Sequence, residues 1–154
     1  MMFHELIQAF GTRLNLAIES DANGVYSFDI DHLHFTIHDL SPQDQVAFTG
    51  DLGLPPSGQT LEGLYRLLLE SQYLFQETHG ATFSIHPESK HITLCRVLPL
   101  MSLDADSFFA AVEQFVNTLE AWVEIIRNYR SAEANTESAY EPELSFLSGD
   151  ILHV

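Results

Sequence analysis

The order of elements is set by residues 64–122, LYRLLLESQYLFQETHGATFSIHPESKHITLCRVLPLMSLDADSFFAAVEQFVNTLEAW. An apolar helix runs into Gly80, which can adopt the left-handed backbone of a helix end without steric cost. Two short strands follow at residues 81–86 and 91–97, and Pro87 suits the turn between them. Asp104 can then cap a long amphipathic helix by accepting from its free amide groups. This segment predicts helix, hairpin, helix.

The N-terminal half predicts one more helix and three strands. From Phe3 to Ile18 apolar residues recur at spacings of three and four, which is typical of a helix with one buried face. The Asn23-Gly24 turn precedes two segments, around residues 26–30 and 33–37, in which apolar and polar residues alternate as in half-buried strands. A third strand is expected around residues 46–52. The whole chain therefore predicts an α+β fold: helix, three-strand antiparallel meander, helix, β-hairpin and helix, forming a twisted antiparallel sheet packed by helices.

The length of 154 residues favours one domain whose hydrophobic core is stable without disulfides or a structural metal. We assign this domain to residues 1–132. Residues 133–154 are acidic and show no periodicity before Leu144, which predicts a mobile tail; an ordered terminal extension is the alternative. The start of the chain lacks the basic region and cleavage site of a secretory signal, and no apolar run approaches the roughly 20 residues that cross a bilayer.

Charge limits the partners of this protein. There are 22 acidic against 6 basic residues, and the formal net charge is −16. Nucleic acid and anionic membranes are not expected as partners, because both are bound by clustered Lys and Arg, and the basic residues here are scattered. An acidic surface favours solubility and attraction to basic partners. The single cysteine, Cys95, cannot form an internal disulfide and fits a reducing cytoplasm.

The middle helix is apolar on nearly every side, unlike the first. One core cannot use all of these side chains, and a helix that is apolar all round must be buried on more than one side. We therefore infer a homodimer in which one side packs on the sheet and another on a second copy; the alternative is a helix sandwiched within one monomer. The expected interface residues are Leu64, Tyr65, Leu67, Leu68 and Tyr73.

Candidate chemistry is sparse. His32, His34 and His38 share a strand face near Asp31 and Asp39, and His86 and His91 flank the hairpin turn, so zinc binding is one hypothesis. The same histidines are equally the polar face of alternating strands, and no zinc-binding motif accompanies them, so no metal or other cofactor is expected. No nucleophile elbow or phosphate-binding loop is present, and Cys95 is expected to be inert. The chain is therefore not expected to be an enzyme.

Several features resemble the class I type III secretion chaperones, the Tir chaperone family. They are LLLESQYLF at residues 67–75, the turn at residues 78–81, Leu98-Pro99-Leu100, Leu103-Asp104, and the later Phe108, Phe115 and Trp122. The resemblance covers about residues 2–130, and Gln72 departs from it by standing where the family often has asparagine. It implies a virulence-associated cytoplasmic homodimer that binds the N-terminal segment of one or a few effectors in extended form. Such a protein keeps effectors soluble and secretion-competent and targets them to the export apparatus, whose ATPase is a further candidate partner.

An extended segment can add a strand to a sheet edge and place side chains in apolar grooves. The candidate effector-binding residues are Phe3, Phe10, Tyr26, Phe28, Phe35 and Phe48, each of which also suits a core. Two alternatives remain open. One is a protein of the same fold that sequesters a regulator or another chaperone, and the other is a histidine-rich metal-binding protein.

Overall fold

The computed structural model describes the backbone of residues 2–144 and the side chains of residues 2–132. Its α-helices and strands occur in the order α1 (Phe3–Leu14), β1 (Val25–Ile30), β2 (Leu33–Leu40), β3 (Gln45–Asp51), α2 (Thr60–Ser71), β4 (Thr82–Ile85), β5 (Ile92–Pro99) and α3 (Ala105–Leu144). Short 3-10 turns lie at Ser41–Gln43, Tyr73–Phe75 and Leu100–Ser102. The predicted order of elements is confirmed.

The five strands form one antiparallel sheet in the order β1-β2-β3-β5-β4. The meander pairs Phe28 with Phe35 and Ile37 with Phe48, and the hairpin joins it through pairing of β3 with β5, where Gly50 faces Leu94. β1 and β4 are consequently the two edges of the sheet, and each leaves one side of its backbone unpaired within the described chain.

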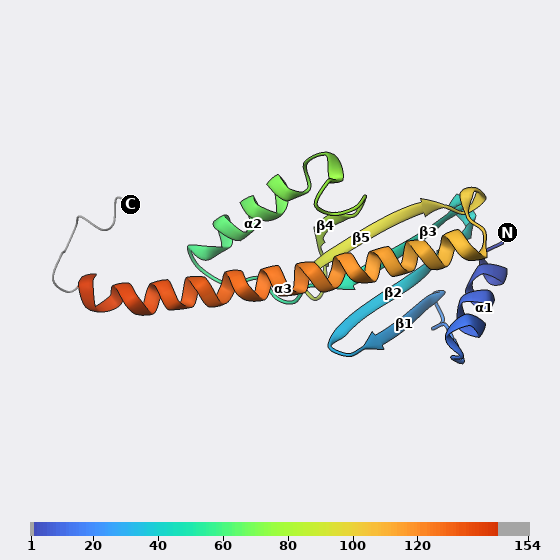
Figure 1. Ribbon diagram of the computed structural model, residues 1–154, viewed down its shortest axis with the longest axis horizontal. Coiled ribbons are helices and arrows are strands. Elements are labelled where there is room, and N and C mark those ends of the chain that lie inside the picture. Colours follow the sequence, from blue (N-terminus) through green and yellow to red (C-terminus); the bar gives the residue numbers. More distant parts are fainter. Residues whose placement is uncertain (1, 145–154) are drawn as a thin grey trace.

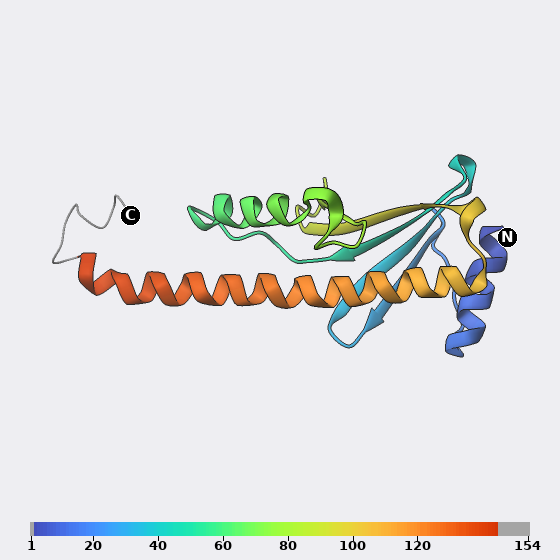
Figure 2. The same cartoon turned by 45° about the horizontal axis from the view of Figure 1, so that its top comes forward.

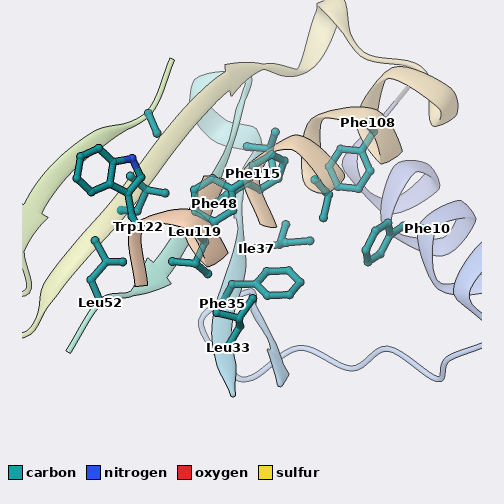
Figure 3. Close-up of a cluster of buried hydrophobic side chains, with 14 of the residues drawn as sticks. Phe10, Leu33, Phe35, Ile37, Phe48, Leu52, Phe108, Phe115, Leu119 and Trp122 are labelled. Carbon is teal, nitrogen blue, oxygen red and sulfur yellow. The ribbon is translucent and has the colours of Figure 1, made fainter. Parts of the chain in front are cut away.

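The core lies between one face of the sheet and helices α1 and α3 (Figures 1 and 3). Strand alternation sends Leu33, Phe35 and Ile37 of β2 to this face, where they are almost fully buried. Phe108 and Phe115 of α3 pack edge-on or tilted against Phe48, with ring centroids 5.9 and 5.6 Å apart. Aromatic burial of this kind supplies a large share of the stability of a small domain.

Gly50 allows α3 to approach β3 closely. A Cβ at this position would lie 2.5 Å from Cδ1 of Leu119, which no real contact tolerates. Leu119 is itself fully buried in the core. Gly50 therefore sets the distance between helix and sheet.

The middle helix ends earlier than predicted. α2 stops at Ser71, and Leu74 and Phe75 have positive φ angles of 54° and 58°, so residues 73–75 do not continue it. Contacts from distant parts of the chain hold this turn: the Phe83 amide donates to Oε1 of Gln72 at 2.6 Å, and Nε1 of Trp122 donates to the Glu77 carbonyl at 3.0 Å. The expectation of one apolar helix reaching Gly80 was wrong because these tertiary hydrogen bonds favour a turn.

α3 is 40 residues long, or about 60 Å at 1.5 Å per residue. Figures 1 and 2 show it crossing one face of the sheet and then continuing beyond it alongside α2. The two helices touch where Gly63 of α2 meets the Tyr129 hydroxyl, since a Cβ on Gly63 would lie 2.3 Å from that oxygen. α2 and α3 thus form a helical pair at the β4 end of the sheet.

The acidic segment begins as helix. The sequence predicted a mobile tail over residues 133–154, whereas the α3 backbone remains helical through Leu144. Residues 131–141 include several alanines and glutamates and neither glycine nor proline, which favours continuation of the helix. Residues 145–154 lie outside the described part of the chain, and the mobility of the segment stays a prediction.

Asp104 caps α3 as predicted. The Ser107 amide donates to Oδ1 of Asp104 at 2.8 Å, and the Asp104 amide donates to the Ser107 hydroxyl at 2.9 Å. The hydrogen bond from the Ser107 amide is the main cause that lowers the pKa of Asp104 below its usual range, and the hydrogen bond with the Ser107 side chain is the second cause.

Replacing Asp104 with alanine is expected to lower the melting temperature by a few degrees near neutral pH, because an N-terminal amide loses its acceptor. Since the folded-state pKa is lowered, the carboxylate stabilises the fold fully above its ordinary pKa of 3.8, and this contribution is lost as pH falls through the folded value. The difference between the urea midpoints of the two proteins should therefore narrow in acid. A difference that stays constant from pH 7 to pH 3 would contradict a charged cap.

Candidate protein-binding surfaces

The six aromatic residues predicted to bind an effector all lie on the helix-covered side of the sheet. Phe3 contacts Tyr26 at a centroid distance of 5.7 Å, Phe10 contacts Phe28 at 5.7 Å, and Phe28 stacks on Phe35 at 5.0 Å. Phe48 joins the same layer through Phe108, which also meets Phe10. The structure therefore brings the six residues into one continuous aromatic layer.

Burial divides these six residues into two groups. Phe3, Phe10, Phe35 and Phe48 belong to the buried core, whereas Tyr26 and Phe28 on edge strand β1 are half-buried. A folded protein can offer only the second pair to a partner without rearrangement. A direct role for the other four in binding stays a prediction.

A groove of about 320 Å³ opens between α1 and the chain around β1. Its apolar lining comes from Ile7, Leu16, Ile18 and Tyr26, and it lies beside the free edge of β1. We call this the α1–β1 groove. Leu16 and Ile18 were not among the predicted binding residues, because the apolar spacing extended the first helix to Ile18, whereas α1 ends at Leu14.

A second apolar surface lies at the opposite edge of the sheet. A cavity of about 220 Å³ is lined by α2 residues Tyr65, Leu68 and Leu69 and by Phe83, Ile85 and Ile92 of the hairpin. Around it the structure exposes the large side chains that we call the α2–β4 patch: Leu69, Tyr73, Leu74, Phe75 and Ile85. Such a cluster of exposed apolar side chains marks a candidate interaction surface.

The predicted interface residues do not all face outward. Leu64 and Leu68 belong to the core, Tyr65 and Leu67 are half-buried, and Tyr73 is 74% exposed. Leu69, Leu74, Phe75 and Ile85 were missed. The all-round apolar helix signalled Leu69, but the exposure of residues 74 and 75 depends on the turn that ends α2.

The histidines do not assemble into a metal site in the described chain. Within residues 2–132, no group of three or more His, Cys, Asp or Glu side chains is arranged to hold a metal ion. His34 instead pairs with Asp29 and His91 with Asp51, while Nδ1 of His86 accepts from the Glu88 and Ser89 amides at 3.2 Å. The predicted cluster of His32, His34 and His38 is separated because His32 lies in the β1–β2 turn.

The environment of Cys95 does not favour a nucleophilic role. Burial raises the pKa of its thiol, so the reactive thiolate is disfavoured. The residue sits within β5, paired with Thr49 and Thr82 of the neighbouring strands.

No helix in the described range combines the length and the hydropathy required to traverse a membrane. The fold has one sheet covered by α1 and α3, two free edges, a groove of mixed polar and apolar lining near β1 and an apolar surface near β4, and these features are those of a protein-binding α+β domain.

Comparison with known proteins agrees with this class. The model of the Tir chaperone protein (CesT) family matches residues 5–123. The chain therefore belongs to this family of type III secretion chaperones, which are binding proteins rather than enzymes. The match ends before the distal part of α3, so the helical extension lies outside it. No curated protein matches the sequence.

Solved structures share the fold at low sequence identity. The HopA1-SchA chaperone–effector complex contains a chain with a TM-score of 0.64 and 14% identity, over 79% of this chain and 93% of that one. The ExsC-ExsE complex gives a TM-score of 0.65 at 17% identity, covering 80% and 96%. The heterodimeric ExoU-SpcU complex from the type III secretion system of Pseudomonas aeruginosa gives 0.61 at 18% identity, covering 84% and 97%.

Proposed function

We propose that this protein is a cytoplasmic chaperone that binds the N-terminal segment of one or a few effectors in extended form. It keeps them soluble and secretion-competent and targets them to the export apparatus. Family membership supports the class of function, and the similar HopA1-SchA structure is a chaperone–effector complex. The observation that carries the proposal is the α1–β1 groove beside a free strand edge.

The physics of this groove suits an extended peptide. Such a peptide gains backbone hydrogen bonds by pairing with the free side of β1, and every second side chain then points toward the groove. Tyr26 and Phe28 alternate on β1 and would contact those side chains. Several small anchors of this type hold an unfolded segment without nucleotide or metal.

We also propose that two copies associate through the α2–β4 patch. The five large side chains of the patch are exposed to solvent in the single chain. Packing against a second copy would bury them and remove their apolar surface from water. The adjoining free edge of β4 can contribute backbone pairing. This interface leaves the α1–β1 groove open on each copy, so effector binding and dimer formation are compatible. The ATPase of the export apparatus is the partner we propose for delivery.

Tyr26→Asp is expected to reduce capture of the client at least about tenfold, because a charge would face the groove where an apolar anchor is needed. The measurement is quantitative capture from the native host on purified protein, with the retained client mapped to its N-terminal segment. Met101→Asp is the control, since Met101 is 86% exposed and does not line the groove.

Equal capture by both variants would contradict the groove assignment. A captured protein that is a transcriptional regulator or another chaperone, bound outside an N-terminal segment, would instead support the sequestering function.

A further inference from the structure

The face of the sheet opposite the core carries a hollow. Figures 1 and 2 show α3 on one side of the sheet and no described helix over the other. A cavity of about 430 Å³ opens there, over β2, β3 and the β4–β5 turn. The side chains that give it polar character are His34, Thr36, Thr49, Asp51, His86 and His91. We call it the histidine cavity.

Two of its histidines are fixed by carboxylates. Nδ1 of His34 lies 2.8 Å from Oδ1 of Asp29, and Nδ1 of His91 lies 2.8 Å from Oδ1 of Asp51. A carboxylate only accepts, so Nδ1 of each ring carries a hydrogen, and Nε2 is an acceptor in the neutral form of the ring. No hydrogen bond from either Nε2 is found among the described residues. Both rings therefore present unused acceptors.

The floor of the cavity adds oxygen atoms. The hydroxyls of Thr36 and Thr49 are hydrogen-bonded to each other, and Nε2 of His38 lies 2.7 Å from the Thr36 hydroxyl. Burial lowers the pKa of His38, opposed by the charge of Asp21, so this ring favours its neutral form. The floor thus contributes neutral hydroxyl and imidazole groups rather than positive charge.

Among the described residues that line the cavity, Asp51 is the one Asp, Glu, Lys or Arg side chain. None of the lining side chains in the described chain is lysine or arginine, and the nearby Lys90 directs its amine to the Pro87 carbonyl at 2.7 Å. Asp29 and Asp51 supply formal negative charge beside the His34 and His91 rings, within a protein of net charge −16. A site rich in acceptors and negative charge favours a cation with many donors. The guanidinium of arginine, with five donors in a planar fork, is the protein group with that chemistry.

We propose that the histidine cavity docks an arginine side chain of a basic peptide segment. Asp51 and Nε2 of His34 and His91 are the groups that accept its hydrogen bonds. The cavity lies on the face of the sheet opposite the aromatic layer, so it is separate from the α1–β1 groove. This interaction does not rest on the proposed chaperone function.

The test uses three peptides of one sequence that carry arginine, lysine or citrulline at a single position. Citrulline keeps the shape of arginine without the charge. Titration calorimetry on the full chain at pH 7.5 and physiological salt should show the arginine peptide binding at least about tenfold more tightly than the citrulline peptide. In the unmodified protein, NMR signals of the His34 and His91 rings should shift on addition of the arginine peptide, which locates it without any substitution.

Asp51→Asn removes one acceptor charge and is expected to weaken arginine-peptide binding about tenfold. Glu120→Gln removes the same charge from the exposed surface of α3 and should leave the affinity unchanged. Equal affinities for arginine and citrulline, unshifted His34 and His91 signals, or equal losses in the two variants would each overturn the proposal. Equal losses would indicate general attraction to an acidic protein.

Discussion

Replacing Phe48 with alanine is expected to lower the free energy of unfolding by about 3–5 kcal/mol. Phe48 is 1% exposed and lies at the centre of the core, between Ile37 on the neighbouring strand and Phe108 and Phe115 on α3 (Figure 3). Removing the ring leaves a cavity that the rigid sheet cannot close, so lost contacts add to lost burial.

Urea unfolding at one fixed protein concentration measures this effect, because association with a second copy would otherwise change the apparent stability. Met101→Ala is the control and is expected to stay within about 0.5 kcal/mol of the unmodified protein, since Met101 is 86% exposed. Urea unfolding together with client capture by the Phe48→Ala protein separates two roles of Phe48. A stable Phe48→Ala protein that fails to bind its client would show a groove residue, whereas a destabilised one is a core residue.

Replacing Leu69 with aspartate is expected to weaken self-association about 100-fold or more. Leu69 is 67% exposed in the single chain, so the substitution should leave the fold intact. In the proposed dimer residue 69 is buried in the interface, and burying an unpaired carboxylate there costs several kcal/mol. Sedimentation velocity across a range of concentrations should show monomers for this variant and dimers for the unmodified protein.

Met101→Asp is again the control and should remain dimeric. Leu68→Asp cannot serve in this test, because Leu68 is 3% exposed within the core and a charge there would unfold the protein before it could report on association. An unmodified protein that sediments as a monomer would refute the homodimer. A Leu69→Asp protein that dimerises normally would move the interface away from the α2–β4 patch.

The two candidate binding surfaces sit at opposite edges of one sheet. In the order β1-β2-β3-β5-β4, the meander ends at β1 and the hairpin ends at β4, so each half of the chain contributes one free edge. The α1–β1 groove, with its mixed polar and apolar lining, lies near β1, and the apolar α2–β4 patch lies near β4. The proposed assignments, client at β1 and second copy at β4, follow from this division.

The distal part of α3 is a feature of this chain beyond the family match. The match ends at residue 123, while the helix continues to Leu144. Ile126 is still buried, and Tyr129 contacts α2 at Gly63, so the first turns beyond the match belong to the folded domain. The extension therefore supports α2 before it leaves the body of the protein.

Local sequence determined the elements whose signals are local. Alternation in residues 33–37 specified a strand with Leu33, Phe35 and Ile37 on one face, and the structure buries all three. Asp104 marked the start of α3 because a cap needs only the amides of the next turn. The family, the α+β class and the order of the elements were therefore accessible from residue patterns.

Tertiary structure decided what depends on distant partners. α2 ends at Ser71 because Gln72 and Glu77 are bonded by Phe83 and Trp122, which no local pattern contains. Pairing of β3 with β5 made β1 and β4 the edges, and this left Tyr26 and Phe28 half-exposed while Phe35 and Phe48 became core. Apolar periodicity identifies the face of an element that avoids water, but packing of the whole chain determines which residues of that face remain for a partner.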